Sequence, residues 1–329
     1  MFRLAEWRVE RGIGETRAIR VVDGRIIEAR IEPEDGLRAG AVIAARLVKR
    51  IPARNQAIAT WDGGEALVTP LPAGVTEGAA CRIEITRPPL PEPGKPKRAR
   101  ARPAAPDAVP GPGPTLAELL NAPATLPTRA DDFEALGWSE LLEEAASGRV
   151  RFAGGELTIS LTPAMTLIDV DGEAAPAELA ITGARAAAEA IVRLDLAGSI
   201  GIDLPTTPDR SARLAAAAAI DAAIPQPFER TAVNGFGFIQ IVRRRSRLSL
   251  PELAASDPVG WHARAALRIA EHTPGAGQRT LTAHPDLVAR LAAHPDWLAA
   301  LERRIGAAVI LQGDARRAIS AAHVQARHP

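Results

Sequence analysis

The sequence predicts a multidomain protein of the α/β class in a mixed α+β arrangement, and three observations support this prediction. Residues 16–87 consist largely of short β-rich runs separated by Gly and Pro. Residues 164–205 follow a strand–helix–strand pattern, which is the unit of a parallel sheet. The length of 329 residues, 47% of them apolar, is enough for two or three domains that each bury a core.

Residues 1–87 are predicted to form a hairpin followed by a barrel. TRAIRVVDGRIIEARIE alternates apolar and polar residues around Asp23-Gly24, a dipeptide that supplies positive φ in a tight β-turn. The runs AVIAARLVKRI, QAIATWDGGEALVTPL and CRIEITR then predict a small barrel of the OB type.

Residues 88–130 are predicted to be a flexible Pro/Gly/Arg-rich linker, because Pro, Gly and Ala dominate and no apolar period is visible. A basic run within it could hold phosphates nonspecifically, although a solvated linker is the simpler interpretation. The run contains Lys95, Lys97, Arg98, Arg100 and Arg102.

Residues 131–250 are predicted to form an α/β domain, and residues 251–329 a small C-terminal α/β domain. In the α/β domain the sequence predicts a helix ending at Gly148, a strand pair joined at Gly154-Gly155, and further strands at 164–170, 199–205 and 236–245. In the C-terminal domain His-Pro-Asp occurs twice, before two predicted helices, where capping explains it better than metal ligation.

Composition and charge exclude several classes of protein. The net charge of +1 gives no field across the whole chain that would attract polyanions, so contacts with nucleic acid must come from local patches. The single cysteine, Cys81, excludes an internal disulfide and a cysteine-clustered zinc site. The sequence contains no run of 18 apolar residues, the length that would predict a membrane-spanning helix. We expect a cytoplasmic protein.

Three carboxylates stand late in two predicted strands. Strand alternation places Asp169 and Asp171 on one face, and Asp203 lies near the end of the next strand. Parallel strands joined by a crossover helix bring their carboxyl ends to the same side, so we expect Asp169 and Asp203 to be neighbours. Such carboxylates repel one another unless a cation lies between them, and Mg²⁺ suits oxygen ligands. The pattern alone leaves open that all three are ordinary turn acids.

The segments LTPAMTLIDVDG and AAEAIVRLDLAGSIGIDLPTT resemble the two metal-binding strands of the ribonuclease E/G family. On that likeness Asp169 and Asp203 hold the catalytic Mg²⁺, or Mn²⁺ in its place, while Asp171 stands where the family commonly has asparagine. The family implies a DNase I-like catalytic domain and an RNA-binding OB barrel. It also implies a homodimer through the C-terminal domain.

RNA contacts are assigned on the same likeness. NGFGFIQIVRRR resembles the family's next strand, so that Arg243 and Arg245 would neutralise phosphate charge, and Lys49 and Arg50 lie on the predicted barrel. The family's 5′-monophosphate sensor domain and its zinc-link cysteines are missing, so no zinc link is expected. Trp61 is the only aromatic residue of the barrel.

The implied function is Mg²⁺-dependent hydrolysis of single-stranded RNA that leaves 5′-phosphate ends, in RNA processing or degradation. Mg²⁺ on Asp169 and Asp203 would polarise the scissile phosphate and lower the pKa of a bound water. Two alternatives stand beside it. The first is a non-catalytic RNA-binding protein on the same scaffold, and the second is a nuclease that acts on DNA or on structured RNA.

Overall fold

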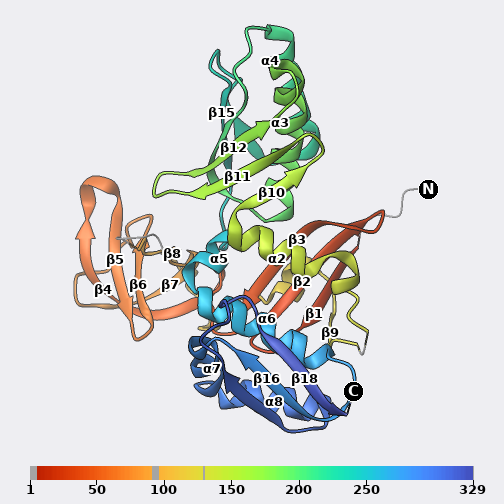
Figure 1. Cartoon of the computed structure of the whole chain (residues 1–329). Coiled ribbons are helices and arrows are strands. Elements are labelled where there is room, and N and C mark those ends of the chain that lie inside the picture. The colour runs from red at the N-terminus through yellow and green to blue at the C-terminus, as the bar shows by residue number, and fades with distance from the viewer. Residues whose placement is uncertain (1–5, 91–95, 129, 329) are drawn as a thin grey trace. The chain divides into compact units, whose positions relative to one another are not determined.

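The computed structural model describes residues 6–90, 96–128 and 130–328 (Figure 1). It confirms a mixed α+β protein that contains a closed five-stranded barrel. The chain divides into two compact units. One consists of Met1–Asp35, Ala122–Ala146 and Leu253–Pro329, and the other of Gly36–Asn121 and Ser147–Glu252. The expected domain boundaries differ from this division, because the N-terminal hairpin belongs with the C-terminal segment and not with the barrel.

The first unit contains two sheets. The predicted hairpin forms around Asp23 and Gly24, whose φ angles are 48° and 74°, and it is extended to four strands in the order β3-β2-β1-β9. The C-terminal sheet has the order β17-β16-β18. The strands are β1 Trp7–Arg11, β2 Glu15–Val22, β3 Arg25–Pro33, β9 Ala124–Thr125, β16 Ala276–Ala283, β17 Val309–Gly313 and β18 His323–His328.

The longer helices of this unit are α2, α6, α7 and α8, whose bounds are given below. Both His-Pro-Asp motifs lie at helix starts, and the His284 side chain accepts a hydrogen bond from the backbone N–H of Asp286. The first motif therefore caps its helix as expected, whereas the side chain of His294 makes no capping hydrogen bond and stacks on Trp297 instead. The helices are α2 Trp138–Ser147, α6 Pro258–His272, α7 Pro285–Ala292 and α8 Pro295–Ile305, and the short helix α5 Leu250–Ser256 lies at the boundary between the units.

A buried ion-pair network joins the N-terminal strands to α6 within the first unit. Arg268 donates to Glu10 at 2.6 Å and also contacts Asp131, and Arg264 donates to Glu15 at 3.1 Å. The side chains of these pairs on β1, β2 and α6 are all at least 90% buried; they are Glu10, Glu15, Arg264 and Arg268. Breaking one partner of such a pair leaves an uncompensated buried charge, so these contacts bind distant segments of the chain together.

The barrel is closed by five strands in the cyclic order β4-β5-β6-β8-β7. Its interior is filled by small and branched residues such as Leu47, Ile83 and Ile85, all fully buried. The strands are β4 Val42–Ile51, β5 Gln56–Trp61, β6 Gly64–Val68, β7 Ala80–Arg87 and β8 Ala99–Pro103.

The prediction of a linker over residues 88–130 is wrong for much of its length, because β8 completes the barrel. Ala99 and Ala101 point inward and are buried, while Arg100 and Arg102 point outward. Alanine is too small to stand out as an apolar period, so the arginine-rich run resembled a linker. Helix α1 Leu116–Leu120 and strand β9 also lie within it. Lys95, from the basic run, lies outside the described residues.

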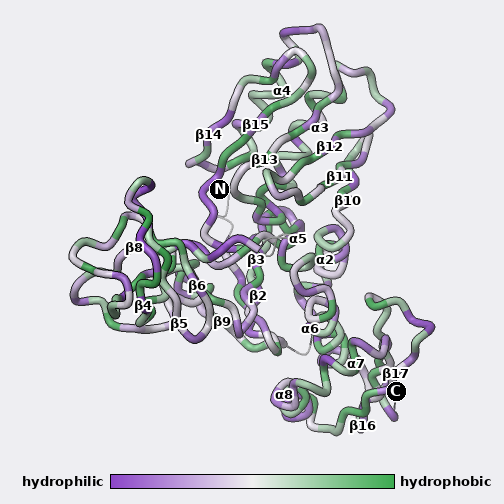
Figure 2. The backbone as a smooth tube through the Cα atoms, turned by 90° about the vertical axis from the view of Figure 1, so that its left-hand side faces the viewer, coloured by the Kyte–Doolittle hydropathy of each residue, from purple (hydrophilic) through white to green (hydrophobic). Residues whose placement is uncertain are grey.

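The rest of the second unit is a six-stranded sheet in the order β10-β11-β12-β13-β15-β14, with two helices on one face (Figure 1). Along its strands, hydrophobic and hydrophilic residues alternate (Figure 2). The buried residues of β12 and β13 include Ile168, Val170, Ile200 and Ile202. The elements are β10 Arg149–Phe152, β11 Gly155–Leu161, β12 Thr166–Gly172, α3 Pro176–Arg193, β13 Gly198–Asp203, α4 Arg210–Ala223, β14 Phe228–Arg230 and β15 Phe238–Arg243.

The helices α3 and α4 fix which face of this sheet is open. Gly183 of α3 lies against Val170, where a Cβ atom would come within 2.3 Å of the valine methyl group. The residues that alternate with the buried ones, among them Leu167 and Asp169, are exposed on the opposite face. The six-stranded sheet therefore presents a largely polar face that neither helix covers.

Candidate active site

Asp169 and Asp203 lie directly opposite each other on neighbouring strands. β12 and β13 are parallel, as the crossover rule predicts, and the two aspartates are Cα partners in the register. Neighbouring strands lie about 4.8 Å apart, and partners in one row of a parallel pair point to the same face. Both side chains are exposed on the open face. The predicted convergence of these two carboxylates therefore appears in the backbone register itself.

Asp171 extends the acidic group along β12. It lies on the same face as Asp169, and its partner across the antiparallel pair with β11 is Glu156. Glu156 in turn accepts a hydrogen bond from Arg149 at 2.6 Å and lies 3.7 Å from Arg151. Sequence reasoning missed Glu156, which lies opposite Asp171 through the register of the antiparallel β11–β12 pair.

The carboxylates perturb one another. Partial burial, followed by the charges of Asp171 and Asp203, raises the pKa of Asp169 above its ordinary value. Within the described part of the chain, no three His, Cys, Asp or Glu side chains come together closely enough to form a metal-binding group. The donor set is thus the facing pair, with Asp171 beside it, and Mg²⁺ often uses only one or two protein carboxylates and fills its remaining positions with water and phosphate.

An apolar area adjoins the facing pair on the open face. Gly201 lies two residues before Asp203, on the same face of β13, and the Phe238 ring covers it. A Cβ atom at this glycine would lie 2.5 Å from the ring and 3.0 Å from Leu167. Phe238 is also the Cα partner of Asp203. An aromatic ring and a leucine side chain therefore lie beside the carboxylates.

One row of residues crosses five strands of the sheet. Successive Cα partners lead from the basic residue on β10 through a hydroxyl and the two carboxylates to the aromatic ring on β15. Four strand spacings make this row roughly 19 Å long. In order, the row consists of Arg149, Thr158, Asp169, Asp203 and Phe238.

The two arginines predicted to bind phosphate lie away from the carboxylates. Arg243 pairs with Gly198 at the opposite end of β13, and its guanidinium donates to the Leu196 carbonyl at 2.6 Å. It shares the helix-covered face with Ile241, since residues two apart in a strand point the same way. Arg245 forms an ion pair with Glu252. The structure therefore brings neither of these arginines to the carboxylates.

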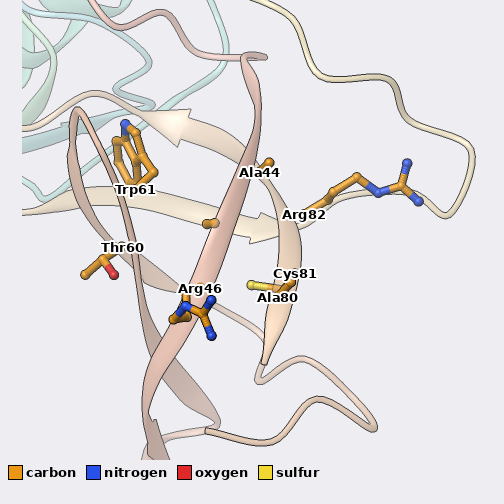
Figure 3. Close-up of a pocket in the computed structure, with 8 residues that line it drawn as sticks. Ala44, Arg46, Thr60, Trp61, Ala80, Cys81 and Arg82 are labelled. Carbon is orange, nitrogen blue, oxygen red and sulfur yellow. The ribbon is translucent and has the colours of Figure 1, made fainter. Parts of the chain in front are cut away.

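Lys49 and Arg50 lie exposed on β4 of the barrel, where β4 bulges against β5. The backbone N–H of Arg50 donates to Glu77. A shallow cavity of about 650 Å³ lies on the same barrel, lined in part by Trp61, Arg46 and Cys81 (Figure 3). Trp61 is half-buried against the barrel core, so its ring serves both as packing and as a wall of the cavity.

Comparisons with known proteins identify no relative. No family model matches the chain, and a search of curated proteins also finds no match. Among the described helices, none has the length and apolar content needed to cross a bilayer. The geometry of the two acidic strands and their sequence resemblance are therefore the basis on which a function can be proposed.

Proposed function

We propose that this chain is a metal-dependent endoribonuclease that hydrolyses phosphodiester bonds of single-stranded RNA and leaves 5′-phosphate ends. The observation that carries the proposal is the in-register pairing of Asp169 with Asp203 on the open face of the six-stranded sheet. The proposal includes an OB-type barrel, a DNase I-like catalytic sheet and action in the cytoplasm on RNA processing or degradation. Assembly as a homodimer through residues 251–329 stays a prediction.

The residues present fit a divalent cation. Partial burial, and after it the charges of Asp171 and Asp203, raise the pKa of Asp169, so a positive charge bound beside these carboxylates would relieve their repulsion. Asp169 and Asp203 would hold Mg²⁺ or Mn²⁺. When bound, such an ion supplies Lewis-acid stabilisation of phosphate charge and lowers the pKa of water.

The side chains around the pair have separate tasks. Asp169 and Asp203 would hold the cation that positions the reacting phosphate, and Asp171 adds negative charge on the β11 side. Thr158, the partner of Asp169, offers a hydroxyl group next to the carboxylates. Because Asp171 stands where asparagine is common in the family that these strands resemble, its charge should strengthen cation binding.

The test is cleavage of a single-stranded RNA oligonucleotide with and without EDTA. We expect Asp169→Asn and Asp203→Asn each to abolish Mg²⁺-dependent cleavage while the fold is kept. Glu229→Gln is the matched control, because Glu229 lies exposed on β14 opposite Val242, away from the pair. Substrates with a 5′-monophosphate or a 5′-hydroxyl group should be cleaved at similar rates, since the chain lacks a segment resembling the sensor domain. Full activity in both aspartate variants would remove the basis of the proposal.

A non-catalytic RNA-binding protein is the second candidate, and the barrel favours it. The cavity beside Trp61 and the exposed Lys49 and Arg50 offer an RNA-binding surface that needs no catalysis. The two arginines of the cavity are already engaged, because Arg46 donates to the Gly78 carbonyl and Arg82 to that of Ala108. Binding of RNA without any cleavage by the wild-type chain in Mg²⁺ or Mn²⁺ would select this candidate.

A further inference from the structure

Phe236 is unusual among the aromatic residues of this protein. The chain has only 11 aromatic residues, six Phe and five Trp. Among those that the structure describes, Phe236 alone is in the exposed class, with 80% of its surface accessible. An isolated exposed apolar residue needs no explanation by itself, so the position of this one decides its meaning.

Hydrogen bonds hold the Phe236 backbone at the carboxyl end of β13. The Asn234 side chain accepts from the N–H groups of Phe236 and Phe238 at 2.9 and 3.0 Å. Thr206, three residues after Asp203, donates its hydroxyl to the Phe236 carbonyl at 2.9 Å. The exposed ring is therefore carried by a fixed turn next to the acidic pair and not by a loose loop.

The opposite side of the pair is basic. The side chain of Arg151 on β10 is 91% exposed, and it lies two residues after Arg149 on the same face. Glu156 of β11 is its Cα partner and separates it from Asp171 on β12. An exposed ion pair with Glu156 is weak, so a phosphate could replace Glu156 as the partner of Arg151 at little cost. A cation thus lies on one side of the carboxylates, and a turn that carries an exposed aromatic ring lies on the other side.

We propose that a single RNA strand crosses the β-strands of this face along the row from Arg149 to Phe238. Phe236 stacks on an unpaired nucleobase on one side of the reacting phosphate, and Arg151 contacts a backbone phosphate on the other side. The inference rests on the proposed function, and it adds the path of the substrate and the requirement for an unstacked base. Base stacking on an aromatic side chain accepts every base, so the site selects for single strands and not for a sequence.

The experiment measures binding of the full-length chain to a fluorescent single-stranded oligonucleotide in EDTA, where the proposed cleavage does not occur. The oligonucleotide is compared with versions that carry one abasic position, moved step by step along the strand. We expect wild type to lose about 5- to 150-fold in affinity at one abasic position. Phe236→Ala should lose this base dependence and Phe236→Trp should keep it. Leu214→Ala, at a 60% exposed position on α4, is the control for loss of an exposed apolar side chain.

Salt dependence tests the basic side of the track. Arg151→Gln should reduce the slope of log affinity against log salt by about one, because one phosphate contact is lost. Arg185→Gln, which removes an exposed arginine from α3, should leave the slope unchanged. Full base dependence in Phe236→Ala, or an unchanged slope in Arg151→Gln, overturns the inference while cleavage by wild type leaves the proposed function standing. A wild-type chain that neither binds nor cleaves RNA overturns both.

Discussion

Asp169 and Asp203 are Cα partners on hydrogen-bonded parallel strands, so the sheet places two like charges in one row. Like charges directly opposite each other in a sheet cost about 0.2–1 kcal/mol. Without a cation, this cost falls on the folded state. The arrangement is thus unfavourable for stability alone and is understandable as preparation for a bound cation.

Removing one charge of the pair should stabilise the metal-free protein. We expect Asp203→Asn to raise the free energy of unfolding in EDTA by about 0.2–1 kcal/mol. Added Mg²⁺ or Mn²⁺ should stabilise wild type by about 2.7 kcal/mol at a hundredfold excess over Kd and leave the variant largely unaffected. Thermal unfolding with and without metal measures both effects, and equal metal stabilisation of variant and wild type would contradict the site.

The raised pKa of Asp169 predicts a pH dependence of stability. The folded chain holds more protons than the unfolded chain between the ordinary aspartate pKa of about 3.9 and the raised folded value, so this group's contribution falls as pH rises through that interval. The Asp169→Asn variant lacks this pH-dependent loss of stability, because asparagine does not titrate. In metal-free buffer the difference in unfolding free energy between variant and wild type should grow in favour of the variant above about pH 4, as denaturant titrations at several pH values would reveal.

The close approach of the Phe238 ring to Gly201 predicts a local packing effect. Gly201→Ala should destabilise the sheet by about 1–3 kcal/mol, because the new methyl group would lie 2.5 Å from the ring. Adding Phe238→Ala should recover part of that loss, and a double-mutant cycle measures the coupling. Gly235→Ala is the control, since nothing lies within 4 Å of a Cβ atom there. Additive effects at Gly201 and Phe238 would mean that the ring does not restrict this position.

The buried network around α6 predicts a larger loss. Arg268→Met should cost about 3–5 kcal/mol, because the buried Glu10 and the mostly buried Asp131 lose their ion pairs with Arg268 and keep longer contacts of 3.6 Å, to Arg17 and His272 respectively. Burial by itself would raise the pKa of Asp131, but the hydrogen bond from Arg268 and its other partners lower it overall. The stability that ionised Asp131 contributes is therefore present at neutral pH and is lost as pH falls. Arg290→Met breaks a more exposed pair with Asp257 and should cost at most about 1 kcal/mol. Chemical denaturation of both variants compares them.

Sequence reasoning located the acidic pair because it needed only two local rules. Alternation along a strand gave the face of Asp169, and the crossover rule made its strand parallel to that of Asp203. The same alternation could have separated Arg243 from the site, because it shares a face with Ile241.

The features that were missed depend on long-range pairing. The local sequence of Ala99–Pro103 does not predict that this segment forms the strand between β6 and β7, with its alanines in the barrel interior. Likewise, the partner of Asp171 is known only from the register of β11. The sequence predicts Phe236 to lie in a strand, but it lies in the turn before β15, where its backbone N–H donates to the Asn234 side chain. These relationships follow from tertiary contacts that periodicity does not encode.

The first unit is assembled from three separated stretches of chain, and its buried pairs link β1 and β2 to α6. During synthesis on the ribosome, Glu15 of the hairpin therefore emerges before its ion-pair partner Arg264, which follows 249 residues later. The inserted unit, by contrast, has its whole sequence available earlier. A truncation that removes α6 should consequently leave Glu10 and Glu15 without the ion pairs that Arg268 and Arg264 provide, and such incompletely packed chains are natural substrates for chaperones and proteases.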